Sequence, residues 1–318
     1  MSTQNINNLV ELFFIKYKEQ KKDNILLTSL KDTSNCFTWE KTFHSIKKLS
    51  LEVKKYTNKG DRCLLISENR PEWFITDLSV MLSEAITVPA YTTYAEKDYE
   101  YIIENCNPKL IFVSNQEQFN KVKEIIKKKS FVTKIFSFEQ LDIDSESYIN
   151  VNKLFFNLDY QDLKIPDLSI KRKDPACIIY TSGTQGNPKG VILSHGGILN
   201  NCDGALDILK PLLTDQTRFL TWLPLSHSYE HTVQFVQISV GAKIFYAESI
   251  EKLIKNMNDC KPQLMTAVPR FYQNLFQKIN ASFNKATGLK KELILKMLEL
   301  GTKKINKQSL TICSGSIF

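Results

Sequence analysis

The feature that most constrains this chain is residues 181–190, a loop-like stretch enclosed by the apolar runs Ile178–Tyr180 and Val191–Leu193. Its residues are almost all small, hydroxylated, flexible or cationic. Glycine removes the Cβ that would block a ligand, and successive backbone N–H groups can then surround an anion. Hydroxyl groups and a lysine add donors and positive charge. We predict a phosphate-binding loop; the alternative is a plain hairpin turn.

The order of residues in this stretch excludes a Walker A loop. That motif requires G-x-x-x-x-G-K-[ST], with a helix beginning at the lysine. Here Gly183 and Gly186 precede Lys189 and Gly190, and a β-type run follows. The stretch is therefore predicted to join two strands and to fold over a phosphate as a flap.

The same decapeptide resembles the phosphate-loop signature of the adenylate-forming superfamily, [ST]-S-G-[ST]-[ST]-G-x-P-K-G, which includes acyl-CoA synthetases and luciferases. One fixed position differs, because Gln185 stands where a hydroxyl residue is usual, and an amide can still donate a hydrogen bond. The resemblance implies a catalytic role for Lys189. It also implies nucleotide contacts from Thr181, Ser182, Gly183, Thr184, Gln185, Gly186, Lys189 and Gly190.

Further segments resemble long-chain fatty acyl-CoA synthetases, in that family's order, from about residue 9 to about residue 310. Residues 223–232 are similar to the block L-P-L-[SA]-H-x-x-E-R-T, with His231 in place of the arginine. Residues 67–73 and 88–91 are similar to N-terminal blocks, and residues 266–272 to a V-P-R block. The resemblance places His227 where a substrate carboxylate meets the α-phosphate, which implies a catalytic role. Substrate contacts are assigned to His227, Tyr229, His231 and Phe235.

Three alternatives stay open for the histidine segment. Without the surrounding block, the preferred interpretation of His227 is a satisfied histidine at a helix start, beside the cap-type residue Ser226. The spelling H-x-x-E-H over residues 227–231 matches an inverted zinc-protease motif, but a third ligand is needed, and we assign no metal ligands. Residues 233–240 either line an acyl tunnel or form a helix packed on the sheet.

The resemblance implies a two-step reaction in which ATP activates a fatty acid and coenzyme A receives the acyl group. Both first reactants are anions, so loop N–H groups, Lys189 and Mg²⁺ must offset repulsion at the α-phosphate. In the superfamily a metal-binding block, a ribose-binding aspartate and a catalytic lysine lie C-terminal to the region matched here. We therefore expect residues 1–318 to be an incomplete N-terminal AMP-binding domain without its C-terminal lid domain.

Alternating strand and helix patterns predict an α/β fold with two lobes of mostly parallel sheet flanked by helices. The approximate lobes are residues 1–141 and 175–318, and residues 142–174 form a connector. Asn69 is predicted to cap the helix after residue 70, and Ser194 or His195 the helix that follows the loop. Residues 116–128 and 284–307 are predicted helices, the second interrupted near Gly301.

Composition limits the class of protein. The 318 residues include seven cysteines without C-x-x-C spacing, which indicates reduced thiols in a cytoplasmic protein. Neither a signal peptide nor an apolar run of about 18 residues is present. The net charge of +8 is mostly lysine, and five arginines argue against nucleic-acid binding. Lysines 121, 123 and 127–129 either face water or contact an anionic membrane peripherally.

The expected function is thus long-chain fatty acid–CoA ligation, with fatty acid, ATP and CoA as the bound molecules. Two rivals remain. One is a ligase for another carboxylic acid, such as an aryl or short-chain acid. The other is a non-catalytic remnant that binds nucleotide or acyl groups.

Overall fold

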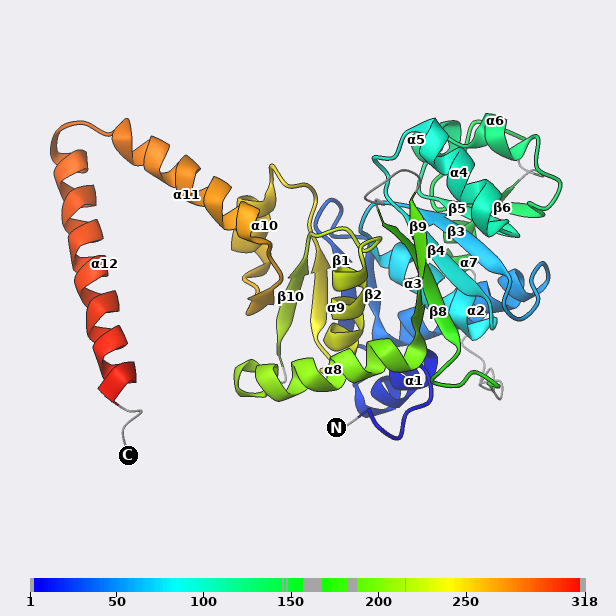
Figure 1. The fold of residues 1–318 in the computed structure, drawn as a ribbon, viewed down its shortest axis with the longest axis horizontal. Coiled ribbons are helices and arrows are strands. Elements are labelled where there is room, and N and C mark those ends of the chain that lie inside the picture. The colour runs from blue at the N-terminus through cyan, green and yellow to red at the C-terminus, as the bar shows by residue number, and fades with distance from the viewer. Residues whose placement is uncertain are drawn as a thin grey trace. The chain divides into compact units, whose positions relative to one another are not determined.

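The computed structural model describes residues 3–144, 146, 148–156, 168–181, 188–214 and 216–314, without the side chains of residues 282 and 305–314. Two compact units divide the chain, Met1–Thr266 and Ala267–Phe318. Figure 1 shows the first unit as two β-sheets with helices packed around them. The predicted α/β class is confirmed.

A seven-stranded sheet forms one half of the first unit. Its neighbouring strands run parallel, except that the last two are antiparallel. In spatial order the strands are β7 (Tyr148–Asn150), β6 (Lys134–Ser137), β5 (Leu110–Val113), β3 (Arg62–Ile66), β4 (Ile86–Ala90), β8 (Pro175–Thr181) and β9 (Lys189–Ser194).

A five-stranded sheet forms the other half of this unit. It is parallel except for the β1–β2 pair. In spatial order its strands are β12 (Leu264–Met265), β10 (Arg218–Thr221), β11 (Lys243–Tyr246), β1 (Ile25–Ser29) and β2 (Cys36–Thr38).

Helices of the first unit begin where the sequence supplies caps. Asn8, Thr38, Asn115 and Ser194 each accept a backbone N–H bond at a helix start, and Pro71 opens α3. The helices are α1 (Leu9–Glu19), α2 (Trp39–Lys54), α3 (Pro71–Leu82), α4 (Glu96–Cys106), α5 (Gln116–Asn120), α6 (Lys123–Ile126), α7 (Val151–Phe156), α8 (His195–Leu209), the 3₁₀ turn Lys210–Leu212, α9 (Ser228–Ser239) and α10 (Leu253–Cys260).

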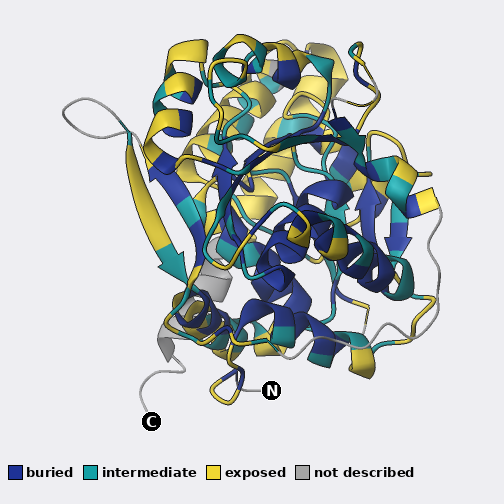
Figure 2. Cartoon of the chain, turned by 90° about the vertical axis from the view of Figure 1, so that its right-hand side faces the viewer, coloured by how far each residue is buried: buried dark blue, intermediate teal, exposed yellow. Residues whose placement is uncertain are grey.

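Two apolar cores cover both faces of the seven-stranded sheet (Figure 2). Side chains of β3 alternate between them: Cys63 and Leu65 join the larger core, and Leu64 and Ile66 join the smaller. The larger core includes α1, α2, α3, α8, α9 and strands of both sheets, while the smaller one includes α4 and α5. One hydrophobic core therefore joins the two sheets.

Several local predictions change in the structure. Asn69 does not cap α3, because the cap position is Arg70 and lacks a side-chain cap bond. The predicted helix 116–128 is two short helices, α5 and α6. Of the two predicted caps, Ser194 and not His195 caps α8, since the Ser194 Oγ accepts the Gly197 N–H at 3.1 Å. Strand pairing also crosses the predicted connector, because β1 pairs with β11 and β4 with β8. The lobe limits stay a prediction.

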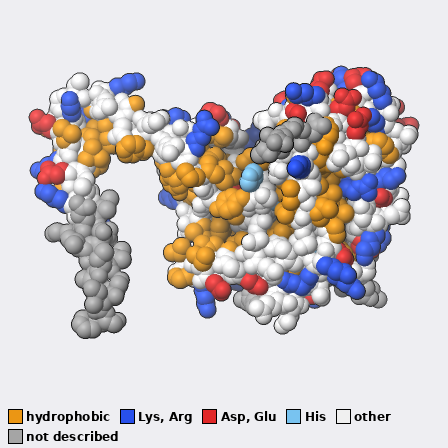
Figure 3. All heavy atoms as spheres, in the orientation of Figure 1, with side chains coloured by type: hydrophobic (Ala, Val, Ile, Leu, Met, Phe, Trp, Pro, Cys, Tyr) orange, Lys and Arg blue, Asp and Glu red, His pale blue; other side chains and the backbone are white. Residues whose placement is uncertain are grey.

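The second unit contains α11 (Pro269–Asn284) and α12 (Gly288–Ser314). The latter continues through Gly301, so the predicted break there is wrong. Several apolar side chains on these helices are exposed, among them Tyr272, Phe276, Leu293 and Met297. Figure 3 shows hydrophobic side chains on the surface of this unit outside its grey part. In the described ranges no helix combines the length and apolar character needed to cross a membrane.

Candidate active site

The residues that flank the predicted glycine loop belong to a β-hairpin. Strands β8 and β9 are antiparallel, and their last described pair is Thr181 with Lys189. The prediction that the stretch joins two strands is therefore confirmed. Both residues are exposed, as is Gly190. The remaining predicted nucleotide contacts lie outside the described residues: Ser182, Gly183, Thr184, Gln185 and Gly186.

Tyr180 anchors this hairpin to the neighbouring helix. Its hydroxyl donates to Asn105 Oδ1 of α4 at 2.6 Å, and burial raises the pKa of the phenol. Gly190 sits opposite Tyr180, and a Cβ built there would lie 3.0 Å from Ile178 Cγ2 and 3.2 Å from the Tyr180 ring. A side chain at this position would require the Ile178 and Tyr180 side chains to shift by a few tenths of an ångström. Close packing therefore fixes the base of the loop.

His227 occupies the N-cap of α9. Its Nδ1 accepts the Tyr229 N–H at 3.2 Å, so the neutral ring carries its proton on Nε2. The imidazole is exposed, in contrast to the three other histidines, which are buried. The helix-start alternative and the anion-contact prediction are thus compatible, because capping uses one ring nitrogen and leaves an N–H donor on the other.

Asn69 holds the loop that precedes His227. Its side-chain amide donates to Leu223 O at 2.7 Å, and its Oδ1 accepts the Leu225 N–H at 3.0 Å. The Trp222 indole donates to Thr266 O at 2.6 Å. Sequence reasoning did not predict these contacts, although a signal for them was present: Asn69 and Trp222 both follow parallel strands at their carboxyl ends.

The other predicted substrate contacts separate into exposed and buried groups. Tyr229 is 50% exposed, whereas His231 and Phe235 lie in the interior at 0%. The Phe235 ring packs against Phe74 and His231, with centroids 6.1 and 5.7 Å apart. Of the two alternatives for residues 233–240, the burial of Phe235 fits a helix packed on the core. Its contact with substrate and that of His231 stay predictions.

Glu230, the acidic residue of the H-x-x-E-H pattern, bonds to Thr266. It is fully buried, and its Oε2 accepts from Thr266 Oγ1 at 2.6 Å. Burial raises its pKa to about 7, against the opposing effect of the Thr266 hydrogen bond. Nowhere in the described ranges do three or more His, Cys, Asp or Glu side chains gather in a way that could hold a metal ion.

A cavity of about 780 Å³ opens along the carboxyl ends of both sheets. Ser67, Tyr91 and Asn115 line it after strands of the larger sheet, and Ser29 and Trp222 after strands of the smaller. Its charged lining residues are Lys31 and Arg70 against Asp32, Glu68, Glu117, Glu139, Glu248 and Glu251. This acidic lining disfavours nucleotide phosphates. Phosphate binding at the hairpin end with Lys189 stays a prediction.

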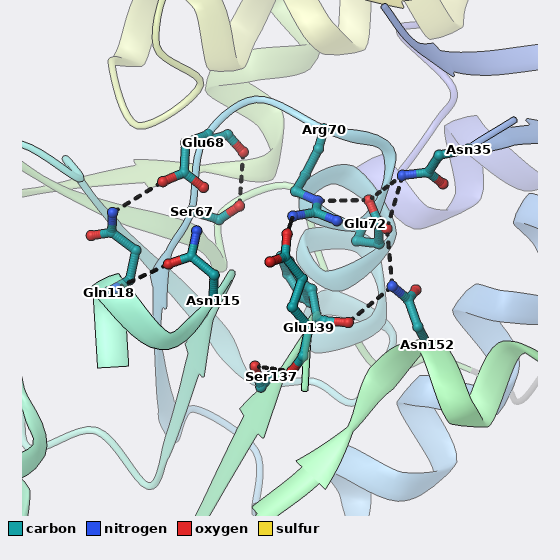
Figure 4. A network of polar contacts seen from close by, with 11 residues as sticks. Asn35, Ser67, Glu68, Arg70, Glu72, Asn115, Gln118, Ser137, Glu139 and Asn152 are labelled. Carbon is teal, nitrogen blue, oxygen red and sulfur yellow. Dashed lines mark hydrogen bonds and ion pairs between the residues drawn. The ribbon is translucent and has the colours of Figure 1, made fainter. Parts of the chain in front are cut away.

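A polar network braces one wall of this cavity (Figure 4). Arg70 donates to Glu72 at 3.0 and 3.2 Å and to Glu139 at 2.8 Å. Asn35 and Asn152 also donate to Glu72, at 3.0 and 3.3 Å. Burial raises the pKa of Glu72, but the Arg70 charge and the hydrogen bonds outweigh it, so the pKa lies below its usual value. The network therefore ties α3, α7 and both sheets together.

The lysine cluster considered for membrane contact is partly neutralised within the chain. Lys121 pairs with Glu117 at 3.0 Å, Lys127 with Glu124 at 2.7 Å and Lys129 with Glu104 at 2.5 Å. These pairs reduce the net positive charge that this surface offers to a lipid. Peripheral membrane contact stays a prediction.

Comparisons with known proteins agree with this geometry. A family described as AMP-binding enzyme matches residues 16–313. The chain is 28% identical to long chain acyl-CoA synthetase 3 of Arabidopsis thaliana over 271 residues, 80% of this chain and 40% of that protein. It is also 28% identical to the human long-chain-fatty-acid–CoA ligase ACSBG2 over 284 residues, 85% of this chain and 41% of that one.

Solved structures share the fold. ATP-bound MatB of Rhodopseudomonas palustris superimposes with a TM-score of 0.69 at 18% identity, over 85% of this chain and 51% of that one. The chain thus spans about 40% of the length of the curated relatives it matches.

Proposed function

Because the chain belongs to the family of AMP-binding enzymes, we propose that the protein activates a long-chain fatty acid with ATP and passes the acyl group to coenzyme A. The observation that carries the proposal is the β8–β9 hairpin, which holds Thr181 and Lys189 as a pair at the two ends of the glycine loop. The choice of a long-chain acid is supported by the relatives' names. The activity is proposed for the whole protein, since this chain spans about 40% of those relatives.

The proposed first step joins two anions. A carboxylate oxygen of the fatty acid attacks the α-phosphorus, the bond to the β-phosphate oxygen breaks, and pyrophosphate leaves. Lys189, with Thr181 and the loop between them, offsets the phosphate charge. The outward Nε2–H of His227 donates to an oxygen of the reacting carboxylate or phosphate. Each such donor in a desolvated site is typically worth about 3 kcal/mol.

The proposed second step transfers the acyl group. The CoA sulfur attacks the acyl carbon, the bond to the AMP oxygen breaks, and the thiol proton is released. Mg²⁺ accompanies ATP in this proposal and would neutralise phosphate charge. The described part of the chain supplies no cluster of three ligands for it, so we route no step through the ion. We further propose that residues 1–318 act as the N-terminal AMP-binding domain in a cytoplasmic protein.

Isotope exchange between pyrophosphate and ATP tests the proposal on the native protein. Exchange should appear with palmitate or oleate and require the acid. Faster exchange with acetate or benzoate would replace the long-chain assignment with another carboxylic acid. ATP or fatty-acid binding without any exchange would favour the non-catalytic remnant and overturn the proposal.

A further inference from the structure

Three polar side chains meet in the interior behind the candidate site. His231 Nε2 lies 2.8 Å from Asp77 Oδ2, and His231 Nδ1 lies 3.4 Å from Cys177 Sγ. The two partners and the imidazole are all 0% exposed. The cluster joins α3, β8 and α9, and the ring centroids of Trp73 and His231 lie 5.4 Å apart in a T-shaped pair. Buried polar groups in such a position need complete pairing.

Two members of the cluster, Cys177 and His231, each lie four residues along the chain from a predicted site residue, Thr181 or His227. Cys177 is on β8, four residues before Thr181 at the mouth of the glycine loop. His231 is on α9, one turn after His227. The backbone N–H of His231 donates to the His227 carbonyl oxygen at 3.0 Å. Contact between His231 and Cys177 therefore connects the strand that leads to the loop with the helix start that presents His227.

The charge of the cluster follows from its surroundings. A buried carboxylate needs a compensating positive charge, and Asp77 Oδ1 has no hydrogen-bond partner in the described part of the chain. His195 on α8 also faces Asp77, but burial lowers its pKa to about 4, so it stays neutral at pH 7. Glu230 on α9 faces Thr266 instead. The compensating proton therefore belongs on His231.

Protonation is compatible with the hydrogen bonding, although a neutral imidazole could also satisfy both contacts by donating to Asp77 and accepting the Cys177 S–H. An imidazolium has two N–H donors, one for the Asp77 carboxylate and one for the Cys177 sulfur. Burial alone would lower the pKa of His231, but Cys177 and Asp77 outweigh it, so the pKa is raised well above its usual value.

We propose that His231 is a positioning residue whose imidazolium, held between Asp77 and Cys177, fixes His227 relative to the strand that carries the glycine loop. The expected effect on nucleotide binding rests on the proposed function. The charge and the geometry of the cluster are independent of that function.

Histidine NMR tests the charge state directly, because the 318-residue chain has four histidines. In protein labelled at histidine Cε1, the resonance lost in His231→Gln identifies His231. We expect it to show the imidazolium shift through pH 7.5 in wild type. In Asp77→Asn, which keeps the shape but removes the charge, the titration should move to lower pH. A neutral His231 at pH 7 in wild type overturns the proposal.

ATP affinity measured against pH tests the positioning role. Wild-type affinity should weaken about tenfold as pH rises through the His231 titration, the size expected for one lost charged hydrogen bond. His231→Arg, which cannot lose its proton, should bind ATP with little pH dependence, and His231→Gln should bind weakly at every pH. Ser239→Ala is the matched control, because it removes a buried hydroxyl from the same helix. Equal affinities in the glutamine variant and wild type overturn the role.

The His227 resonance keeps the test independent of the proposed function. If wild type binds no ATP, the proposed function fails, yet His227 should still shift in His231→Gln and not in Ser239→Ala. An unchanged His227 resonance overturns the positioning role. If circular dichroism shows that His231→Arg does not fold, Asp77→Asn replaces it, with its loss of ATP affinity expected at lower pH than in wild type.

Discussion

The exposed residues of the candidate site and the buried cluster of Asp77, Cys177 and His231 differ in their surroundings, although both involve strand β8 and helix α9. On β8 and α9 alike, the exposed residue lies four positions from the buried one: Thr181 from Cys177, and His227 from His231. The exposed ends have few neighbours, so changes there should alter ligand binding and leave the fold intact. The buried ends are fully packed, so changes there should cost stability first.

Breaking the buried pair should produce the largest effect. Asp77→Ala removes the partner of His231 and leaves a buried charge uncompensated, which typically costs about 3–5 kcal/mol of unfolding free energy. Urea denaturation at pH 7 measures the loss.

A double variant serves as the control for that prediction. Asp77→Leu with His231→Leu removes both charges at once, so it should lose much less stability than Asp77→Ala. If the single and double variants are equally destabilised, packing rather than the ion pair explains the cost.

Glu230 should give the next largest effect, and its size depends on pH. The pKa is raised from 4.5 to about 7, so the folded state binds the proton more tightly than the unfolded chain. Its contribution to stability is present below about pH 4.5 and is lost as pH rises through about 7, by about 3 kcal/mol in total. Glu230→Gln should remove this loss, as urea midpoints from pH 4 to pH 8 would show.

An exposed carboxylate provides the comparison for Glu230. Glu117 is 73% exposed at its side chain, so Glu117→Gln should leave the pH dependence of stability unchanged. The same pH profile in Glu230→Gln and wild type would contradict the assignment of this loss to Glu230.

Lys189 should show the reverse pattern, with a binding effect and little change in stability. Lys189→Ala removes an exposed charge at the loop and should weaken ATP binding about tenfold, since a hydrogen bond to a charged group is worth about 1.5 kcal/mol or more. Calorimetric titration with ATP measures this, and Lys153→Ala, another exposed lysine, is the control. If Lys189→Ala and Lys153→Ala lost the same ATP affinity, the effect would come from the overall charge of the protein and not from a contact of Lys189 with ATP.

Ser194 should give the smallest effect. Its hydroxyl caps α8, so Ser194→Ala should cost about 1 kcal/mol of stability. ATP affinity should stay the same, because the cap lies at the opposite end of β9 from Lys189. If Ser194→Ala instead lost much ATP affinity and no stability, the assignment of Ser194 to stability and of Lys189 to binding would be wrong.

Much of the fold was predictable because its information is local. Alternating strand and helix patterns predicted the α/β class, and Ser194 was one of two residues predicted to cap the helix after the loop. The joining of two strands by the glycine stretch also followed from residue order. Asn69 was predicted wrongly, because an asparagine before a helix suits a cap equally well when its amide instead bonds to a distant loop.

The sequence by itself determined the α/β class and the phosphate-type composition of the loop, and the roles of Lys189 and His227 stay predictions made from it. Only the tertiary structure decided that β1 joins β11, and that His231 turns inward to Asp77 and Cys177. The reason is physical: helix and strand patterns depend on neighbours within a few residues, whereas these contacts join residues 54 and 154 positions apart. Such partners are selected by packing of the whole core.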